Sequence, residues 1–435
     1  MTSHPVHRHS HTEAMLTVEE ALERILSFFE PLEPARVPIT EAGGMVISAD
    51  VVSHLDVPPL DNSAMDGYAV SSQSVSGAAP HAPATLRVID KLAAGELPTT
   101  HVGPGTAIRI MTGAPVPQGA DAVVPFEDTD EVERRLKART LDEISVRHPA
   151  DPGSNVRQAG RDLARGQTVL RRGTVIGPSQ VGLLASLGHA TVSVHRRPVV
   201  AILSTGDELV EPGLPLPEGR IYDSNGAGIA AAVMEAGGTP RQIGTARDDL
   251  ESVNAKIDEG IDSDMLITSA GVSKGDFDMV KDVLTRRGSM QFWSVRMRPA
   301  KPLAFGLLSA SDGSGRTVPH LGLPGNPVSA LVAFEQFGRL AIAKMLGRDP
   351  AMRPSVRAVL TDPIHNTDGR RVYARAVVTK RDGRYYASLT GDQSSNLLTS
   401  MAAANGLAIC PEDLALKQAG DEVDVLMLRW PPEVF

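Results

Sequence analysis

The stretch that decides the fold of this 435-residue chain is Val199-Val-Ala-Ile-Leu-Ser-Thr-Gly-Asp-Glu-Leu209. Its first five residues form a continuous apolar run, which is typical of a strand buried on both faces of a parallel sheet. The residues from Ser204 to Glu208 then change to small and acidic side chains, which predicts a loop at the carboxyl end of that strand. We therefore expect an α/β domain to begin near Pro198.

Strands and helices alternate from this stretch to about residue 347. Apolar residues at helical spacing predict helices at 225–236, 249–259, 276–287 and 327–346. Apolar runs between them predict strands near 241–245, 264–269, 292–295, 303–308 and 318–323. This alternation is typical of a doubly wound α/β domain with a largely parallel sheet, and we place that domain at 197–347.

The sequence on either side of this domain is richer in short strands and turns. Residues 54–148 predict an inserted β domain, and residues 15–53 together with 149–196 predict an N-terminal linker or dimerisation domain. Residues 348–435 predict a small C-terminal β domain. Residues 1–14 contain four histidines, and we expect them to form a disordered tail. The chain is thus an α/β multidomain protein.

Composition excludes several classes of function. The formal net charge of −9 argues against a nucleic-acid-binding surface. The single cysteine, Cys410, excludes internal disulfides and fits a reducing compartment. No apolar run is long enough to insert directly into a membrane, and no signal peptide is recognisable, so we expect a cytoplasmic protein.

Polar loops follow the predicted strands of the α/β domain. Ligands of open α/β sheets bind beyond the carboxyl ends of the strands, so we expect these loops to converge on one site. The candidate residues are Ser204, Thr205, Gly206, Asp207 and Glu208; then Asp248; then Ser269, Gly271, Ser273 and Asp278; and finally Arg298, Lys301, Pro324, Gly325, Asn326 and Pro327. Taken singly, Asp207 and Asp248 could be helix N-caps, and Arg298 and Lys301 could be surface cations.

The mixture of residue types indicates the chemistry of the ligand. Glycine, serine and helix N-termini present N–H and O–H donors to an anion, which predicts a phosphate. Arg298 and Lys301 add positive charge for a phosphate or another oxyanion. Carboxylates beside a phosphate need a hard cation between them, and oxygen ligands without clustered Cys or His favour Mg²⁺. The residues alone predict a Mg²⁺-assisted reaction on a phosphate-containing ligand.

A second polar element lies at Val57-Pro-Pro-Leu-Asp-Asn-Ser-Ala-Met-Asp-Gly-Tyr68. The two prolines restrict the backbone, and Asn62 and Gly67 suit tight turns. The segment can therefore hold Asp61 and Asp66 in fixed directions, although an ordinary rigid loop would also explain its Pro and Gly residues.

Five motifs together resemble the molybdopterin molybdenumtransferase family, which includes the E domain of gephyrin. They are Asp61-Asn-Ser-Ala-Met-Asp-Gly-Tyr-Ala69, Ile108-Arg-Ile-Met-Thr-Gly-Ala-Pro-Val116, Ser204-Thr-Gly-Asp-Glu-Leu209, Thr268-Ser-Ala-Gly-Val-Ser273 and Leu323-Pro-Gly-Asn-Pro-Val-Ser-Ala330. The resemblance covers nearly the whole chain from about residue 15. It implies a central molybdopterin-binding α/β domain with an inserted β domain and a C-terminal β-barrel-like domain.

The resemblance also implies an activity. Enzymes of this family take adenylylated molybdopterin and molybdate, insert the metal at the dithiolene sulfurs and release AMP, with Mg²⁺ assisting. A cytoplasmic homodimer is implied, as are partnerships with a molybdopterin adenylyltransferase and with molybdoenzymes. The implied catalytic residues are Asp61 and Thr112 from one protomer and Glu208, Asp248, Asp278 and Lys301 from the other, together with Pro324 and Pro327. Asp207, Glu208 and Asp248 are the implied Mg²⁺ carboxylates.

Two residues depart from the family pattern. Ala270 stands where the family usually has a glycine, and Ala300 does so in the Arg298-Pro-Ala-Lys301 segment. Each alanine adds a methyl group and disfavours a left-handed backbone. These departures leave a second hypothesis open, a gephyrin-like dimeric scaffold that binds a short peptide of a membrane receptor or a cytoskeletal tail.

Overall fold

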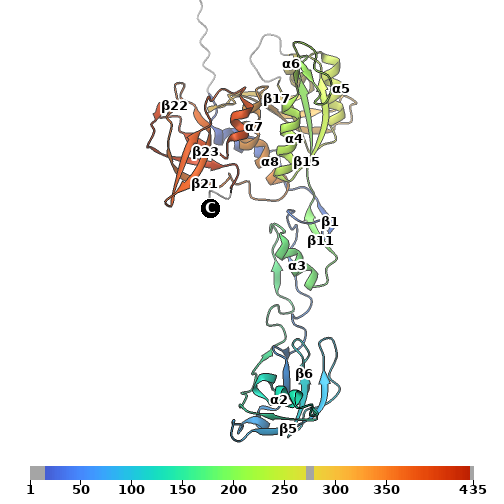
Figure 1. Ribbon diagram of the computed structural model, residues 1–435. Coiled ribbons are helices and arrows are strands. Elements are labelled where there is room, and N and C mark those ends of the chain that lie inside the picture. The colour runs from blue at the N-terminus through green and yellow to red at the C-terminus, as the bar shows by residue number, and fades with distance from the viewer. Residues whose placement is uncertain (1–14, 271–278, 432–435) are drawn as a thin grey trace, which may run out of the picture. The chain divides into compact units, whose positions relative to one another are not determined.

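The structure is a computed structural model that describes residues 15–270 and 279–431 (Figure 1). The chain divides into two compact units. The first comprises Met1–Ser48, Val175–Gly177 and Thr191–Phe435, and the second comprises Ala49–Thr174 and Pro178–Ala190. This division is coarser than the domain boundaries predicted from the sequence, which stay a prediction. No helix in the described part of the chain has the length and apolar character needed to cross a membrane.

A six-stranded sheet forms the centre of the first unit, and its strand order is β15-β12-β16-β20-β19-β17. Four neighbouring strands are parallel: β15 (Thr239–Ala246), β12 (Val199–Thr205), β16 (Met265–Ser269) and β20 (Thr317–Leu323). The fifth strand, β19 (Pro302–Ser309), runs antiparallel to β20 and to the edge strand β17 (Gly288–Ser294). Ser204 pairs with Ser269, and Ser269 pairs with Leu323, so the parallel strands end side by side.

Helices cover both faces of this sheet. One face packs against α1 (Val18–Leu26), α4 (Ser224–Ala236) and the long helix formed by α7 (Pro327–Ala333), a π-helical turn (Phe334–Gly338) and α8 (Arg339–Met345). The other face packs against α5 (Leu250–Gly260) and α6 (Met279–Arg287). The apolar run in β12 explains why both faces are covered. Val200 and Ile202 point into one core, and Ala201 and Leu203 point into the other. The predicted doubly wound α/β domain is confirmed.

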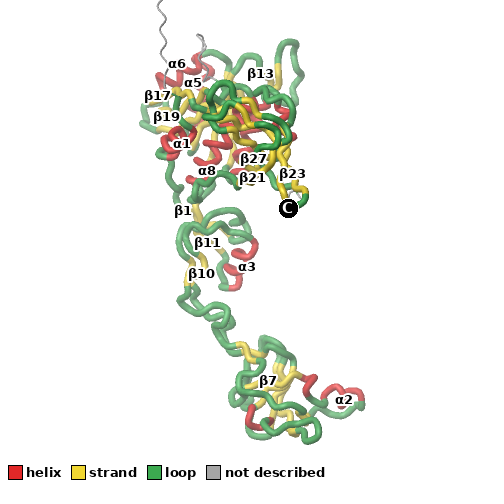
Figure 2. The backbone as a smooth tube through the Cα atoms, turned by 90° about the vertical axis from the view of Figure 1, so that its left-hand side faces the viewer, coloured by secondary structure: helices red, strands yellow, loops and turns green. Residues whose placement is uncertain are grey.

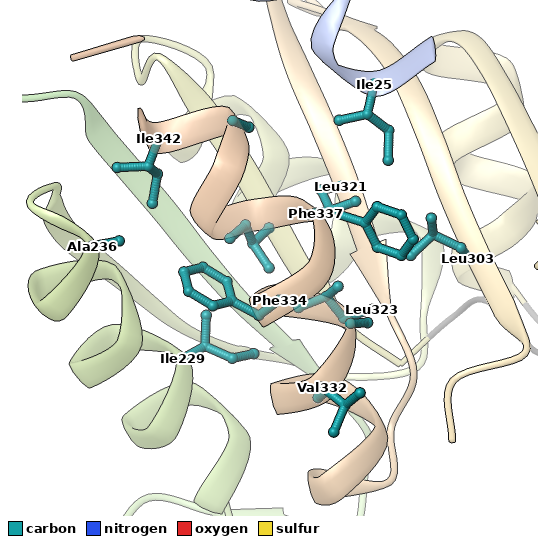
Figure 3. Close-up of a cluster of buried hydrophobic side chains, with 14 of the residues drawn as sticks. Ile25, Ile229, Ala236, Leu303, Leu321, Leu323, Val332, Phe334, Phe337 and Ile342 are labelled. Carbon is teal, nitrogen blue, oxygen red and sulfur yellow. The ribbon is translucent and has the colours of Figure 1, made fainter. Parts of the chain in front are cut away.

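Figure 3 shows the first of these cores. Ile229 of α4 and Phe334 and Phe337 of the π-helical turn lie over Leu321 and Leu323 of β20. All of these side chains are buried, so the end of β20 is fixed directly below the loop that leads into α7.

The C-terminal part of the first unit is a closed five-stranded β-barrel. Its strands are β21 (Ser355–Leu360), β23 (Arg371–Arg381), β24 (Arg384–Leu389), β25 (Gly406–Cys410) and β27 (Glu422–Met427). Pairing of β25 with both β23 and β27 closes the barrel. Figure 2 labels β21, β23 and β27 of this barrel. Shorter elements here are β18 (Met297–Arg298), β22 (Ile364–His365), β26 (Leu416–Lys417) and α9 (Leu398–Ala403).

The second unit is built on a five-stranded sheet with the order β7-β4-β6-β5-β8. Its strands are β4 (Gly67–Val70), β5 (Ala84–Leu92), β6 (Thr106–Ile110), β7 (Ala122–Pro125) and β8 (Glu143–Val146). Shorter elements are β2 (Val51–Val52), β3 (Asn62–Ser63), β9 (Val156–Arg157), β10 (Thr168–Leu170), α2 (Glu131–Leu136), α3 (Pro178–Ser186) and the 3₁₀ turns Ser72–Val75 and Phe126–Asp128. In the first unit, β1 (Pro34–Pro38) pairs with β11 (Thr191–His195).

The ends of several helices in the structure differ from the bounds expected from the sequence. The first helix begins with a capping box, in which Thr17 and Glu20 exchange hydrogen bonds, and it ends at Leu26. The helix predicted at 327–346 is interrupted by the π-helical turn, and such turns are frequent at functional sites. The beginning of the helix predicted at 276–287 lies outside the described residues.

Candidate functional site

A cavity of about 690 Å³ lies at the carboxyl ends of the parallel strands, and we call it the strand-end cavity. Seven of the predicted site residues line it: Thr205, Glu208, Ser269, Pro324, Gly325, Asn326 and Pro327. The register of the sheet explains this convergence, because β12, β16 and β20 end beside one another and release their loops at the same edge. The loops that follow these strands therefore converge on one cavity, and its role as the functional site stays a prediction.

Hydrogen bonds between loops fix the floor of the strand-end cavity. The Ser269 hydroxyl donates to the Ser204 hydroxyl over 3.2 Å, which ties the ends of β16 and β12. The side-chain amide of Asn225 donates to the Gly325 carbonyl over 2.7 Å, which ties the first turn of α4 to the loop before α7. The floor is thus a set of cross-linked backbone turns.

One wall of the strand-end cavity comes from residues that the sequence interpretation missed. The paired short strands β13 (Leu209–Val210) and β14 (Ile221–Tyr222) bring Leu209, Ile221 and Tyr222 to the cavity. Ile221 is 56% exposed and Tyr222 is 44% exposed, so both present apolar surface that a ligand in the cavity could cover. The Tyr222 hydroxyl donates to the Leu214 carbonyl over 3.0 Å, so its ring is held in place.

Other missed residues approach from two further elements. Asp223, Ser224 and Asn225 line the cavity at the start of α4, where Asp223 is the N-cap and accepts from the Gly226 amide over 2.9 Å. Asn396 and Leu398 reach the cavity from the segment that leads into α9. The polar residues just before a predicted helix could have signalled the first group, whereas no local pattern in the sequence marks Asn396 or Leu398.

The acidic residues are grouped beside the cavity. The Asp248 amide donates to Asp207 Oδ1 over 3.3 Å. Partial desolvation of its carboxyl group, reinforced by the negative charges of Asp207 and Glu208, raises the pKa of Asp248, although the residue as a whole is exposed. Neither Asp207 nor Asp248 caps a helix, since Asp249 is the N-cap of α5. Among the described residues, none forms an ion pair with Asp207, Glu208 or Asp248, so the three negative charges repel one another.

Gly206 is the residue that lets Glu208 fold back toward the strand end. Its φ angle is +147°, and a Cβ atom at this position would lie 2.6 to 2.8 Å from the Glu208 carboxyl group. In the described parts of the chain, no three His, Cys, Asp or Glu side chains are close enough to hold a metal ion by themselves. A cation at Asp207, Glu208 and Asp248 would need further oxygen ligands from a substrate.

A second cavity of about 370 Å³ lies between Arg298 and the C-terminal barrel, and we call it the arginine cavity. Arg375 is only 1% exposed and also lines it. Its guanidinium donates to the Ser400 hydroxyl and to the carbonyls of residues 392, 393 and 394, and it forms no ion pair with any described residue. Desolvation lowers the pKa of Arg375. Asp392 also lines the arginine cavity and interacts electrostatically with Arg375, but no described carboxylate hydrogen-bonds to the buried guanidinium.

The predicted basic residues do not lie in the strand-end cavity. Arg298 and Pro299 line the arginine cavity, whereas Pro302 lines the strand-end cavity, so the short segment from Arg298 to Pro302 separates the two. Lys301 is exposed and lines neither, and its carbonyl accepts from the Val295 amide over 2.8 Å.

Both alanines that depart from the family pattern have a left-handed backbone. The φ angle is +89° at Ala270 and +73° at Ala300. This conformation costs about 1 to 2 kcal/mol for an alanine. Ala270 lines the strand-end cavity. Ala300 lies within the Arg298–Pro302 segment and is 5% exposed, because it packs in the core of the first unit.

The remaining predicted residues lie either in the second unit or outside the described part of the chain. Asp61 and Thr112 belong to the second unit. Asp61 Oδ1 accepts from the Ala159 amide over 2.7 Å, and both the amide and the hydroxyl of Thr112 donate to Asp66. Gly271, Ser273 and Asp278 lie outside the described residues.

Comparison with known proteins gives the family. Residues 16–188 match the MoeA N-terminal region (domain I and II), residues 201–344 match a probable molybdopterin binding domain, and residues 357–428 match the MoeA C-terminal region (domain IV). The chain is 40% identical over 418 residues to molybdopterin molybdenumtransferase 2 of Mycobacterium tuberculosis, covering 94% of this chain and 99% of the relative. The chain belongs to the molybdopterin molybdenumtransferase family.

Further members of the molybdopterin molybdenumtransferase family agree with this assignment. The enzyme of Bacillus subtilis is 34% identical over 434 residues, which cover 97% of each chain. A solved structure of the molybdopterin biosynthesis moeA protein from Pyrococcus horikoshii has a TM-score of 0.81 at 33% identity, covering 96% of this chain and 100% of that one. The fold is thus that of the family over almost its whole length.

Proposed function

We propose that this protein is a molybdopterin molybdenumtransferase that inserts molybdenum from molybdate into adenylylated molybdopterin and releases AMP. The single observation that carries the proposal is the strand-end cavity, in which hydroxyl and amide donors, carboxylates and an apolar wall converge at the sheet edge. The nearly full-length relatives named molybdopterin molybdenumtransferase support the same activity.

The division of the strand-end cavity into polar and apolar surfaces fits an adenylylated heterocycle. Thr205 and Asn326 offer donors to a phosphate group. Leu209, Tyr222 and the facing Leu398 offer apolar surface to a planar ring. A substrate with both a phosphate and a ring would therefore be held in one orientation, with its phosphate near the carboxylates.

Asp207, Glu208 and Asp248 would hold the Mg²⁺ ion that we propose for this reaction. Their oxygen donors are of the hard type that Mg²⁺ prefers, and phosphate oxygens of the substrate would complete its ligand shell. Desolvation is the main cause of the raised pKa of Asp248, the negative charges of Asp207 and Glu208 add to it, and a cation would offset the repulsion between these charges. When bound, Mg²⁺ would neutralise the negative charge on the phosphate as AMP leaves.

The arginine cavity is the proposed entry point of molybdate. Buried Arg375 and the neighbouring Arg298 supply positive charge to a cavity of suitable size for a small oxyanion. The wall between the two cavities begins at Arg298 and ends at Pro302, so Lys301 lies where the two substrates would approach each other. Lys301 would stabilise negative charge at this point.

We further propose that the protein acts as a homodimer in the cytoplasm. Asp61 and Thr112 would then complete the site of the partner protomer, as the family resemblance implies. A molybdopterin adenylyltransferase would supply the substrate, and molybdoenzymes would receive the product.

Genetic complementation tests the proposed function. The unmodified gene should restore molybdoenzyme activity to a bacterial strain that lacks its own molybdenumtransferase, and Glu208→Gln should not. Glu251→Gln, on the exposed first turn of α5, is the matched control and should complement fully. Failure of the unmodified gene, with normal protein levels, would favour the scaffold hypothesis, which no described feature supports at present.

A further inference from the structure

Backbone hydrogen bonds hold both ends of the turn formed by residues 324–327, which we call the 324–327 turn. Just before it, the Leu323 carbonyl accepts from the Ala270 amide over 3.0 Å. Just after it, the Val328 amide donates to the Ser395 carbonyl over 3.1 Å. Neither bond involves the peptide group that joins the two central residues of the turn.

A side chain holds that central peptide group. Nδ2 of Asn225, in the first turn of α4, donates to the Gly325 carbonyl over 2.7 Å. The peptide between Gly325 and Asn326 is planar and trans, so its N–H group points in the direction opposite to its C=O group. The bond from Asn225 therefore fixes the direction of the Asn326 N–H group, which points away from the Asn225 side chain.

The Asn326 N–H group is available to a ligand. Pro324 and Pro327 have no amide hydrogen, so only Gly325 and Asn326 can donate from the backbone of the 324–327 turn. Asn326 is exposed, and no residue in the described part of the chain accepts from its amide. Asn225, Gly325 and Asn326 all line the strand-end cavity. An unpaired donor whose direction is set by Asn225 thus belongs to a residue of the cavity wall.

We propose that Asn225 is a positioning residue that holds the Gly325–Asn326 peptide in the orientation that presents the Asn326 N–H group to the phosphate of the nucleotide. Gly325 has no side chain to restrict this peptide, so loss of the Asn225 amide would let the peptide rotate. The N–H group would then face the phosphate for less of the time, and the phosphate would be bound less tightly. This inference rests on the proposed function, because it concerns the AMP portion of the proposed substrate.

AMP binding to the full-length protein tests the inference. Isothermal titration calorimetry with AMP and Mg²⁺ should give a dissociation constant about three- to tenfold higher for Asn225→Ala than for the unmodified protein, which is the range expected for one hydrogen bond. The matched control is Asn254→Ala, because the Asn254 side-chain amide also donates to a carbonyl over 2.7 Å, that of Leu250 in α5 on the opposite face of the sheet. This control should leave AMP binding unchanged. AMP binding by Asn225→Ala as tight as that of the unmodified protein would overturn the inference.

A double-mutant cycle shows whether Asn225 acts through the Asn326 N–H group. Asn326→Pro removes this group, and the φ angle of −66° at Asn326 already suits proline, whereas Asn326→Ala keeps the group. Asn225→Ala should raise the dissociation constant of AMP by less than about twofold in the Asn326→Pro background and by about three- to tenfold in the Asn326→Ala background. Equal increases in both backgrounds would overturn the inference, because Asn225 would then affect AMP binding in another way.

Nuclear magnetic resonance gives a signature at the amide itself. In protein labelled with ¹⁵N-asparagine, AMP should shift the backbone amide signal of Asn326, which is the asparagine amide signal that Asn326→Ala removes. The shift at saturating AMP should be smaller in Asn225→Ala. AMP that binds without moving this signal would overturn the inference alone. No AMP binding by the unmodified protein would overturn the proposed function and this inference with it.

Discussion

Thr112 donates two hydrogen bonds to one oxygen atom of Asp66, from its backbone amide and from its hydroxyl, and each measures 2.7 Å. Both bonds lower the pKa of Asp66, the backbone bond most strongly. Asp66 belongs to the proline-led segment singled out in the sequence, and it fixes the direction of the Thr112 side chain. The residue in this loop that acts on Thr112 is therefore Asp66, while Asp61 bonds to the Ala159 amide.

Removal of the Asp66 carboxylate should impair the reaction through Thr112. Asp66→Ala is expected to lower the rate of molybdenum insertion roughly tenfold, because a Thr112 side chain that is no longer held in the correct direction contributes less to the reaction. Thr112→Ser keeps both donors and should retain most activity. The matched control is Asp90→Ala, since exposed Asp90 likewise accepts from a threonine hydroxyl, that of Thr100, and from a backbone amide. A loss with Asp90→Ala equal to that with Asp66→Ala would contradict this role.

Mixed dimers test whether two protomers share one site. Asp61→Ala and Glu208→Gln homodimers should each be inactive. Co-expression should give heterodimers with one intact site, and a random mixture should recover about a quarter of the normal activity if the dimer has two-fold symmetry. Insertion assays on the co-purified mixture measure this. Recovery of no activity, with heterodimers shown by mass spectrometry, would mean that Asp61 and Glu208 act within one chain.

Ala300→Gly should stabilise the protein. Relief of the left-handed strain at φ +73° favours the folded state by about 1 to 2 kcal/mol, and the greater freedom of glycine in the unfolded chain offsets up to about 1 kcal/mol of this. Urea denaturation followed by far-UV circular dichroism should show a net gain of about 0.5 to 1 kcal/mol. A net loss would indicate that the Ala300 methyl group contributes more packing energy than its backbone strain removes.

Buried His320 should make the protein less stable in weak acid. Complete burial lowers the pKa of His320 to about 3, and its Nε2 lies 3.0 Å from the Thr268 hydroxyl. Between pH 6.5 and pH 3 the unfolded chain binds a proton at this histidine that the folded chain does not. The contribution of neutral His320 to the free energy of unfolding is therefore complete above pH 6.5. It falls as the pH decreases, by up to about 1.4 kcal/mol per pH unit.

Comparison of two pH values isolates this histidine from the other titrating groups. His320→Gln can keep a hydrogen bond to Thr268 but does not titrate. The variant should lose less free energy of unfolding between pH 7 and pH 5 than the unmodified protein does. Equal losses in both proteins would show that His320 has no part in the acid sensitivity.

Much of the fold and part of the site could be predicted because local patterns carry them. The apolar run in β12 indicated a strand buried on both faces, and the small and acidic residues after it indicated a strand-end loop. The register that aligns Ser204, Ser269 and Leu323 then follows from parallel pairing alone. Thr205, Glu208 and Asn326 line the strand-end cavity for this reason, and their roles in a site stay a prediction.

The rest of the site depends on long-range packing that no local pattern contains. Leu398 reaches the strand-end cavity because the segment before α9 packs against the α/β domain. Arg298 lies in the arginine cavity because β18 pairs with β23 of the barrel, which turns Arg298 away from the strand-end cavity.

Release of AMP is the measurement that tests the central claim most directly. The purified protein, incubated with adenylylated molybdopterin, Mg²⁺ and saturating molybdate, should release one AMP for each molybdenum atom that becomes able to activate an apo-molybdoenzyme. Omission of molybdate or chelation of Mg²⁺ should stop both. No AMP release by the unmodified protein, beside an active family member under the same conditions, would contradict the claim that this chain is a molybdenumtransferase.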